Sequence, residues 1–271
     1  MAVKTTARVT SRDGTMITYD RRGSGAPLVL VDGAFCRRAF GPMAKIADLL
    51  ADRFTVFNYD RRGRDASGDT PPYAIERELD DLDAVIAAAA GPVGLFGISS
   101  GAMLALRAVS RGAQVSRLVV FEPPLVLAGS TGSLPPDRRA EIVRRAEAGD
   151  RSGATDTFMR MVGVPGFAFP LMKLFGVWKK LTAAAHTVPY DLALLGDTGG
   201  DHALPDEIRT MLAAIRVQTT VCVGGKSPPY LHHAAKIVAD GVPGAQLREM
   251  PGQIHNVGAK PMATVLAERL A

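Results

Sequence analysis

The sequence has little cysteine and no long hydrophobic run. Its 271 residues include two cysteines, Cys36 and Cys222, which are far apart and form no Cys-x-x-Cys pair. Two such thiols suggest neither a disulfide framework nor a zinc site. The chain contains no stretch of about twenty apolar residues, the length that a helix needs to span a membrane. The N-terminal MAVKTTARVTSRDG lacks the apolar run of a secretory signal. We therefore expect a cytoplasmic protein with no metal and no membrane partner.

A surface charge of one sign is also missing. The 32 Lys and Arg residues exceed the 27 Asp and Glu residues by only five, and the densest clusters, DRRGRD and EIVRRAE, mix both signs. Nucleic-acid binding would favour a basic stripe interleaved with aromatic residues, but aromatic residues make up only 6% of the chain. We expect no nucleic-acid partner, and the sequence leaves the oligomeric state open.

What the sequence does contain is an alternation of buried strands and amphipathic helices. APLVLVDG is one of several continuous apolar runs, typical of strands buried on both faces. Strands are predicted over residues 7–11, 15–20, 26–33, 53–60, 91–97, 116–124, 217–225 and 245–252. Helices are predicted over 40–51, 73–90, 101–110, 230–240 and 260–271. This order indicates an α/β fold, with a mostly parallel central sheet and helices on both faces.

The alternation is interrupted once. Residues 125–205 show helical segments and loops but no convincing buried strand. We therefore expect a core formed by residues 1–124 and 206–271, with residues 125–205 inserted as a helical cap over one end of the sheet.

A motif with potential chemistry lies in LFGISSGAML. Gly97-Ile98-Ser99-Ser100-Gly101 follows a predicted buried strand and opens a predicted helix, the context in which G-x-S-x-G forms a nucleophile elbow. The flanking glycines allow close backbone approach around Ser99. Ser100 would then offer its backbone N–H at the helix start, where a negative oxygen is stabilised. Tight helix–strand packing is another reason for the same two glycines, and it can hold at the same time.

With this elbow the chain resembles the α/β-hydrolase superfamily, over essentially its whole length. YDRRGRDAS resembles that superfamily's Asp-x-Arg-Gly-x-Gly-x-Ser loop, although Asp65 stands where the second glycine is usual. PGQIHNV resembles its late Gly-x-x-His turn. The resemblance implies an α/β-hydrolase fold, Ser99 as nucleophile and His255 as catalytic base. His186, His202, His232 and His233 fit that role less well.

The resemblance also implies an oxyanion hole. One backbone N–H would come from Ser100 and a second from the loop after LVLV, where Ala34 can serve. The superfamily often has His-Gly in this loop, whereas this chain has Asp32-Gly33. A carboxylate close to the oxyanion would oppose catalysis unless it points away, and Asp32 could simply organise the loop.

The usual acid of the superfamily is missing from its expected place. After the strand VCVGG, Ser227 stands where an Asp is expected. Glu122, at the carboxyl end of LVVFE, is our candidate replacement. Some members, including haloalkane dehalogenases, carry a glutamate there, although those enzymes use an Asp nucleophile. The alternatives are that no acid, or a different one, assists His255, and that Glu122 pairs with a cap arginine or caps a turn.

The predicted cap contains many large apolar side chains. They are candidates to line a substrate pocket, together with residues beside the oxyanion loop, although packing of the cap on the core explains most of them equally well. The candidates are Phe35, Cys36, Phe158, Met161, Phe169, Met172, Phe175 and Trp178.

These features together predict a serine hydrolase without a cofactor. Its substrate would be an ester, lactone or thioester of a bulky apolar small molecule, cleaved through an acyl-enzyme. Two other functions remain open on the same scaffold. One is a cyclase, lyase or isomerase of a secondary metabolite, and the other is a ligand-binding member without turnover.

Overall fold

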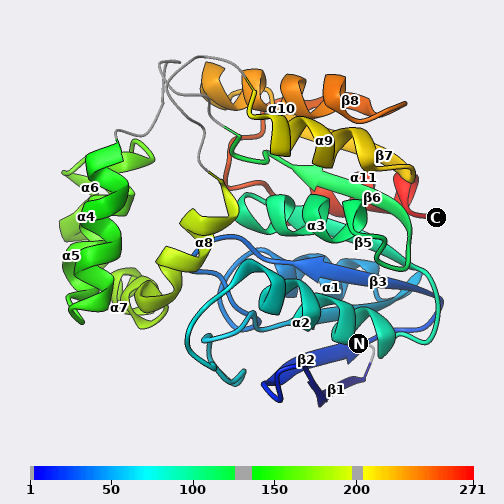
Figure 1. Ribbon diagram of the computed structural model, residues 1–271, viewed down its shortest axis with the longest axis horizontal. Coiled ribbons are helices and arrows are strands. Elements are labelled where there is room, and N and C mark those ends of the chain that lie inside the picture. The colour runs from blue at the N-terminus through cyan, green and yellow to red at the C-terminus, as the bar shows by residue number, and fades with distance from the viewer. Residues whose placement is uncertain (1–2, 126–135, 197–203) are drawn as a thin grey trace.

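The fold is built on one eight-stranded sheet, seen in the computed structural model of the chain (Figure 1), which describes residues 3–125, 136–196 and 204–271. The strand order is β1-β2-β4-β3-β5-β6-β7-β8. Strands β3 to β8 pair in parallel, and β1 and β2 add an antiparallel edge. The strands are β1 (Lys4–Thr10), β2 (Met16–Arg22), β3 (Ala26–Val31), β4 (Phe54–Tyr59), β5 (Val93–Ile98), β6 (Val115–Phe121), β7 (Gln218–Gly224) and β8 (Gln246–Met250).

The inner strands are apolar throughout because both of their faces are covered. In β3, Val29 and Val31 pack into one hydrophobic cluster, while Leu28 and Leu30 pack into a second cluster on the opposite face. Successive strand side chains point to opposite faces, so each face of the sheet receives every second residue. The result is a three-layer molecule, as the sequence pattern predicted.

The core helices divide between these two faces. Apolar residues of α1 and α11 pack in the second cluster, whereas those of α2, α3, α9 and α10 pack in the first. The bounds of these helices are α1 (Met43–Leu50), α2 (Ile75–Ala87), α3 (Ser100–Ser110), α9 (Asp206–Ala214), α10 (Pro229–Gly241) and α11 (Ala259–Arg269). No helix in the described residues is long and apolar enough to cross a membrane.

Between β6 and β7 the chain forms a group of helices that stands beside the sheet (Figure 1). This inserted group consists of α4 (Pro136–Glu147), α5 (Arg151–Met161), α6 (Ala168–Leu174), α7 (Val177–Ala183), the 3₁₀ turn η1 (Ala185–Thr187) and α8 (Val188–Leu194). The described part of the segment 125–205 contains no strand, in agreement with its sequence. Residues 126–135 and 197–203, where the predicted cap begins and ends, lie outside the described residues.

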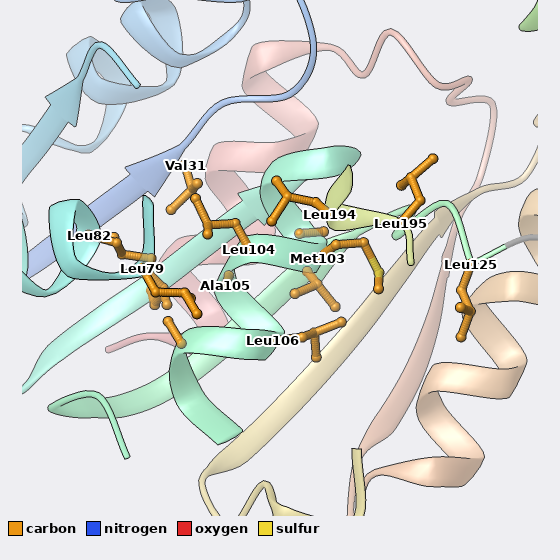
Figure 2. Close-up of a cluster of buried hydrophobic side chains, with 14 of the residues drawn as sticks. Val31, Leu79, Leu82, Met103, Leu104, Ala105, Leu106, Leu125, Leu194 and Leu195 are labelled. Atoms are coloured by element: carbon orange, nitrogen blue, oxygen red, sulfur yellow. The ribbon is translucent and has the colours of Figure 1, made fainter. Parts of the chain in front are cut away.

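Helix α8 connects the inserted group to the core, because it contacts α4 on one side and α3 on the other. Figure 2 shows Leu194 close to Leu104 and Met103 of α3, with Leu195 farther from Leu104. These side chains belong to the hydrophobic cluster that continues to α2 and β3. The inserted helices and the sheet therefore share one apolar core.

Candidate active site

The candidate catalytic side chains lie where neighbouring parallel strands end. Beyond β5, the backbone N–H of Ser99 donates to the carbonyl of Phe121, and beyond β6, that of Glu122 donates to the carbonyl of Cys222. The sheet ladder thus continues one residue past each strand and places Ser99 and Glu122 at one edge. His255 follows β8 on the same side of the sheet. Parallel α/β sheets form their ligand sites at this carboxyl edge.

Ser99 occupies a sharp turn between β5 and α3, with φ of 55° and ψ of −127°. Only close packing permits such a turn. A Cβ atom on Gly97 would lie 2.5 Å from the carbonyl oxygen of Gly101, and one on Gly101 would lie 2.4 Å from that of Val31. Both glycines of the motif are therefore needed for the approach of helix to strand, and the same approach fixes the strained serine at the turn.

Glu122 and His255 meet despite 133 residues of separation. Nδ1 of His255 and Oε2 of Glu122 lie 2.5 Å apart, within hydrogen-bond distance. The carboxylate is fully buried, whereas about half of the imidazole is exposed to solvent. Ser99 and His255 line the same cavity. No hydrogen bond joins their side chains in the described chain, and such bonds often tighten only when substrate is bound.

Ser227 supports Glu122 instead of replacing it. Its Oγ donates to Oε1 of Glu122 at 2.6 Å, and the backbone N–H of Gly224 donates to the same oxygen at 2.7 Å. The residue at the position of the usual acid is therefore a hydrogen-bond donor to the carboxylate on the neighbouring strand. Sequence reasoning noted the missing acid but not this contact, which depends on the pairing of β6 with β7.

Arg64 holds the loop after β3, which is the expected source of the second oxyanion donor. One guanidinium nitrogen of Arg64 donates to the carbonyls of Gly33, at 2.7 Å, and Cys36, at 3.0 Å. Ala34 and Ser100 both line the cavity that contains Ser99. Phe35 has a φ of 60°, and its buried ring packs edge-to-face on Phe158 with centroids 5.1 Å apart.

Asp191, a residue that sequence reasoning missed, joins α8 to this loop and to the elbow. Its carboxylate accepts hydrogen bonds from Arg61 at 2.7 Å, from Arg64 at 2.8 Å and from the hydroxyl of Ser100 at 2.7 Å. Burial would raise the pKa of Asp191, but Arg64 and Arg61 hold the pKa below its ordinary value. Arg61 also pairs with Glu78 at 2.6 Å, so the buried charges compensate one another. The arginines belong to the recognised YDRRGRDAS motif, whereas nothing in the sequence marks Asp191 as their partner.

Asp32 is the one buried carboxyl group at this edge whose oxygens have no hydrogen-bond partner in the described chain. Burial raises the pKa of Asp32 to about 8, against the opposing influence of Arg64 and Arg61. At neutral pH the group is therefore mostly protonated and uncharged. An uncharged Asp32 does not oppose a developing oxyanion, which was the objection raised by its place in the sequence.

The cavity at the site has a volume of about 390 Å³ and a mostly apolar lining. Of the predicted pocket residues, Phe158 and Met161 line it, with Leu192 and Leu195 from the region of α8. Phe35, Cys36, Phe169, Met172, Phe175 and Trp178 are not among the lining residues. Three of these six pack elsewhere or face solvent: the rings of Phe169 and Trp178 contact each other, and Phe175 is 72% exposed.

The remaining reactive side chains have other surroundings. Burial raises the pKa of the Cys36 thiol, which disfavours the thiolate that a cysteine nucleophile needs. His186 bonds to the carbonyl of Gly63, His232 and His233 lie on α10, and His202 is outside the described residues. Among the described residues, no group of three or more His, Cys, Asp or Glu side chains could hold a metal ion.

Comparison with solved structures shows the same architecture. An alpha/beta hydrolase from Sphaerobacter thermophilus DSM 20745 is 43% identical, with a TM-score of 0.87 over 97% of this chain and 99% of that one. An esterase from Exiguobacterium antarcticum is 20% identical, with a TM-score of 0.76, and covers 97% and 98% of the two chains. The enol-lactonase from Burkholderia xenovorans LB400 is 16% identical, with a TM-score of 0.75 and the same coverage. The last two identities show the fold alone.

Sequence comparisons agree. An uncharacterised hydrolase of Bacillus subtilis (strain 168), YraK, is 32% identical over 121 residues, so the match spans 42% of this chain and 43% of that relative. Residues 23–258, most of the chain and all of the candidate catalytic residues, match the alpha/beta hydrolase family. The chain therefore belongs to the alpha/beta hydrolase family.

Proposed function

We propose that this protein is a serine hydrolase that cleaves an ester, lactone or thioester of a bulky apolar small molecule. The observation that carries this proposal is the 2.5 Å contact between His255 and the buried Glu122, at the rim of the cavity that also contains Ser99. A buried carboxylate in this position orients the imidazole and stabilises its protonated form.

In the proposed mechanism, Oγ of Ser99 attacks the substrate carbonyl while Nε2 of His255 accepts the hydroxyl proton. Glu122 holds Nδ1–H of His255 and stabilises the imidazolium that forms. The backbone N–H groups of Ala34 and Ser100 donate to the oxyanion of the tetrahedral intermediate. His255 then gives the proton to the leaving alkoxide or thiolate, and an acyl-Ser99 remains. Water, activated by the same imidazole, hydrolyses this acyl-enzyme to a carboxylic acid and restores Ser99.

The character of the cavity supports this substrate class. Its lining is mostly apolar, and its polar lining residues are few: Ser99, Ser100, Asp191, Lys226, Tyr230, His255 and Asn256. Such a cavity suits an apolar acyl or alcohol group whose carbonyl lies beside Ser99. The structural similarity to an esterase and to an enol-lactonase is consistent with hydrolysis of a carboxylic ester or lactone.

A fluorophosphonate probe tests the nucleophile directly. Because the probe phosphonylates an activated serine, mass spectrometry of the labelled protein should place the adduct on Ser99 and on no other residue. Ser99→Ala should abolish labelling and turnover together. Ser100→Ala is the matched control, since it removes the neighbouring hydroxyl but keeps the backbone N–H, and it should still be labelled at Ser99.

A panel of p-nitrophenyl esters, lactones and acyl thioesters then identifies the substrate class. Wild-type protein should turn over at least one class, with kcat reduced by roughly 10⁴-fold or more in Ser99→Ala. If wild type and Ser99→Ala catalysed a carbon-skeleton rearrangement equally fast, the hydrolase proposal would be overturned in favour of non-hydrolytic chemistry on the same fold. Tight ligand binding by a folded protein that neither labels nor turns over would overturn it in favour of a binding protein.

A further inference from the structure

The peptide that joins Gly33 to Ala34 lies in the loop after β3, outside any helix or strand. It is trans, and a trans peptide points its C=O and its N–H in opposite directions. The group that binds the carbonyl of Gly33 therefore also sets the direction of the Ala34 N–H. Arg64 donates to this carbonyl at 2.7 Å, whereas the turn itself supplies a longer bond of 3.3 Å from the N–H of Cys36.

The N–H of Ser100 needs no such side chain, because the first turn of α3 fixes its direction. The carbonyl of Ser99, in the same peptide unit, accepts from the N–H of Ala102 at 2.9 Å. Neither Ser100 nor Ala34 donates its own N–H to another described residue, and both residues line the cavity. The two donors thus differ in their support, since a helix holds one and a side chain holds the other.

Arg64 is itself held by the inserted helices. One terminal nitrogen contacts both carboxylate oxygens of Asp191, on α8, at 2.8 Å each, and Nε donates to the hydroxyl of Thr187, in η1, at 3.2 Å. The side chain of Arg64 is 1% exposed and is not among the residues that line the cavity. Arg64 therefore does not touch a substrate in the cavity, and it acts on catalysis only through the loop that it holds.

We propose that Arg64 is a positioning residue of the oxyanion hole, and that Asp191 of the inserted helices keeps it in place. The inference rests on the proposed function, since an oxyanion forms only if Ser99 attacks a carbonyl. With the carbonyl of Gly33 bound to Arg64, the N–H of Ala34 points away from Arg64 and is oriented before substrate arrives. The docking of α8 and the stabilisation of the oxyanion are thereby coupled.

Thionoesters separate this role from a general structural one. Sulfur accepts hydrogen bonds weakly, so a substrate with C=S in place of C=O gains little from an oxyanion donor. Arg64→Lys keeps the charge, but one ammonium group cannot replace a guanidinium that contacts the loop, α8 and η1 together. It should lower kcat for the best ester of the panel by roughly 10²-fold with little change in KM. The ratio of kcat for the ester to kcat for its thionoester should fall by about tenfold.

Leu50→Ala is the matched control for lost stability. Leu50 is buried at the end of α1, just ahead of β4 and hence at the opposite edge of the sheet from the cavity. Its truncation should lower the Tm but leave the ester-to-thionoester ratio at the wild-type value. An unchanged ratio in Arg64→Lys would overturn the proposal and leave Arg64 a structural residue.

Asp191→Asn tests the link to the inserted helices. It should lower the same ratio, because Arg64 loses its counter-charge. The double variant Arg64→Lys with Asp191→Asn should lose little more than the larger single loss, because both changes act through one peptide. Two losses that multiply in the double variant would contradict this shared path.

Hydrogen exchange tests the loop without any turnover. The backbone N–H groups of Cys36, Arg37 and Phe40 donate within the loop and report its order. Mass spectrometry should show that they exchange at least about fivefold faster in Arg64→Lys than in wild type or Leu50→Ala. Unchanged exchange would overturn the inference even if the probe labels Ser99. Faster exchange in a protein whose Ser99 is not labelled would instead contradict the proposed function, while confirming that Arg64 holds the loop.

Discussion

At the scale of single residues, the site is marked by backbone strain. Phe35, Ser99 and Glu122 all have positive φ, of 60°, 55° and 48°, a conformation that L residues other than Asn and Asp rarely adopt. All three directly follow or lie just beyond a parallel strand, at the edge where the cavity opens. Strain of this kind persists only where the surrounding structure enforces it, and it clusters at functional sites.

Glu122→Gln tests whether the carboxylate assists His255. The amide keeps the shape of the side chain but cannot stabilise an imidazolium by charge, so kcat should fall by about 10³- to 10⁴-fold with little change in KM. Steady-state kinetics on the best substrate of the ester panel would measure this. Glu249→Gln, an exposed carboxylate near the same edge, should retain wild-type kcat. Activity near wild type in Glu122→Gln would contradict the assignment.

Ser227→Ala tests the support of that carboxylate. The change removes the 2.6 Å hydrogen bond to Glu122 but leaves the bond from the backbone of Gly224. We therefore expect an intermediate effect, with kcat reduced by roughly tenfold. Ser227→Thr keeps the hydroxyl and should recover most of the loss. An equal loss in both variants would indicate disturbed packing and not a missing hydrogen bond.

At the scale of elements, α8 is attached to the core by charge as well as by apolar packing. Asp191 is 2% exposed and bonds to two arginines that are each 1% exposed, at the point where α8 passes the elbow. Removing one partner of a buried ion pair leaves the other charge uncompensated. The free energy of unfolding then falls by more than the intact pair contributes to it.

Asp191→Asn should accordingly lower the free energy of unfolding by about 3 kcal/mol or more, because Arg64 loses its counter-charge and Arg61 keeps only Glu78. Urea denaturation followed by circular dichroism would measure the change. Asp206→Asn on α9, whose side chain is 90% exposed, is the control and should stay within about 0.5 kcal/mol of wild type. Equal stability of the two variants would show that α8 is retained by apolar contacts alone.

At the scale of the whole molecule, Asp32 couples stability to pH. Its carboxyl group has a pKa of about 8 in the folded chain, against an ordinary value of 3.8. Between these two pH values the folded state holds a proton that the unfolded state releases. The contribution of this group to stability is therefore complete below about pH 4 and falls as the pH rises toward 8.

Asp32→Asn should remove this pH dependence because an amide does not ionise. The Tm of the variant relative to wild type should rise progressively from pH 4 to pH 8, by at least about 2 °C in total. Thermal melts at matched ionic strength across this range would measure the difference. A constant difference between the two proteins at all pH values would contradict the raised pKa.

Much of the architecture could be predicted because its signals are local. Continuous apolar runs identified the buried strands, and the position of G-x-S-x-G between a strand and a helix identified the elbow around Ser99. The interruption at 125–205 indicated an inserted helical group for the same reason. The pocket lining was predicted poorly, because large apolar side chains fill cores, cavities and surfaces alike. Phe169, Trp178 and Phe175 have similar sequence surroundings to Met161 but lie elsewhere.

The sequence alone therefore determined the fold class, the order of elements and the turn that carries Ser99, since these depend on hydrophobic periodicity and on glycines at fixed offsets. Only the tertiary structure decided which side chains meet. The contacts of Glu122 with His255, of Ser227 with Glu122 and of Asp191 with Arg61 and Arg64 join residues roughly 100 or more positions apart. Such contacts arise from strand order and helix packing. These bring together distant segments, and the local sequence of one segment does not indicate which other segment it will contact.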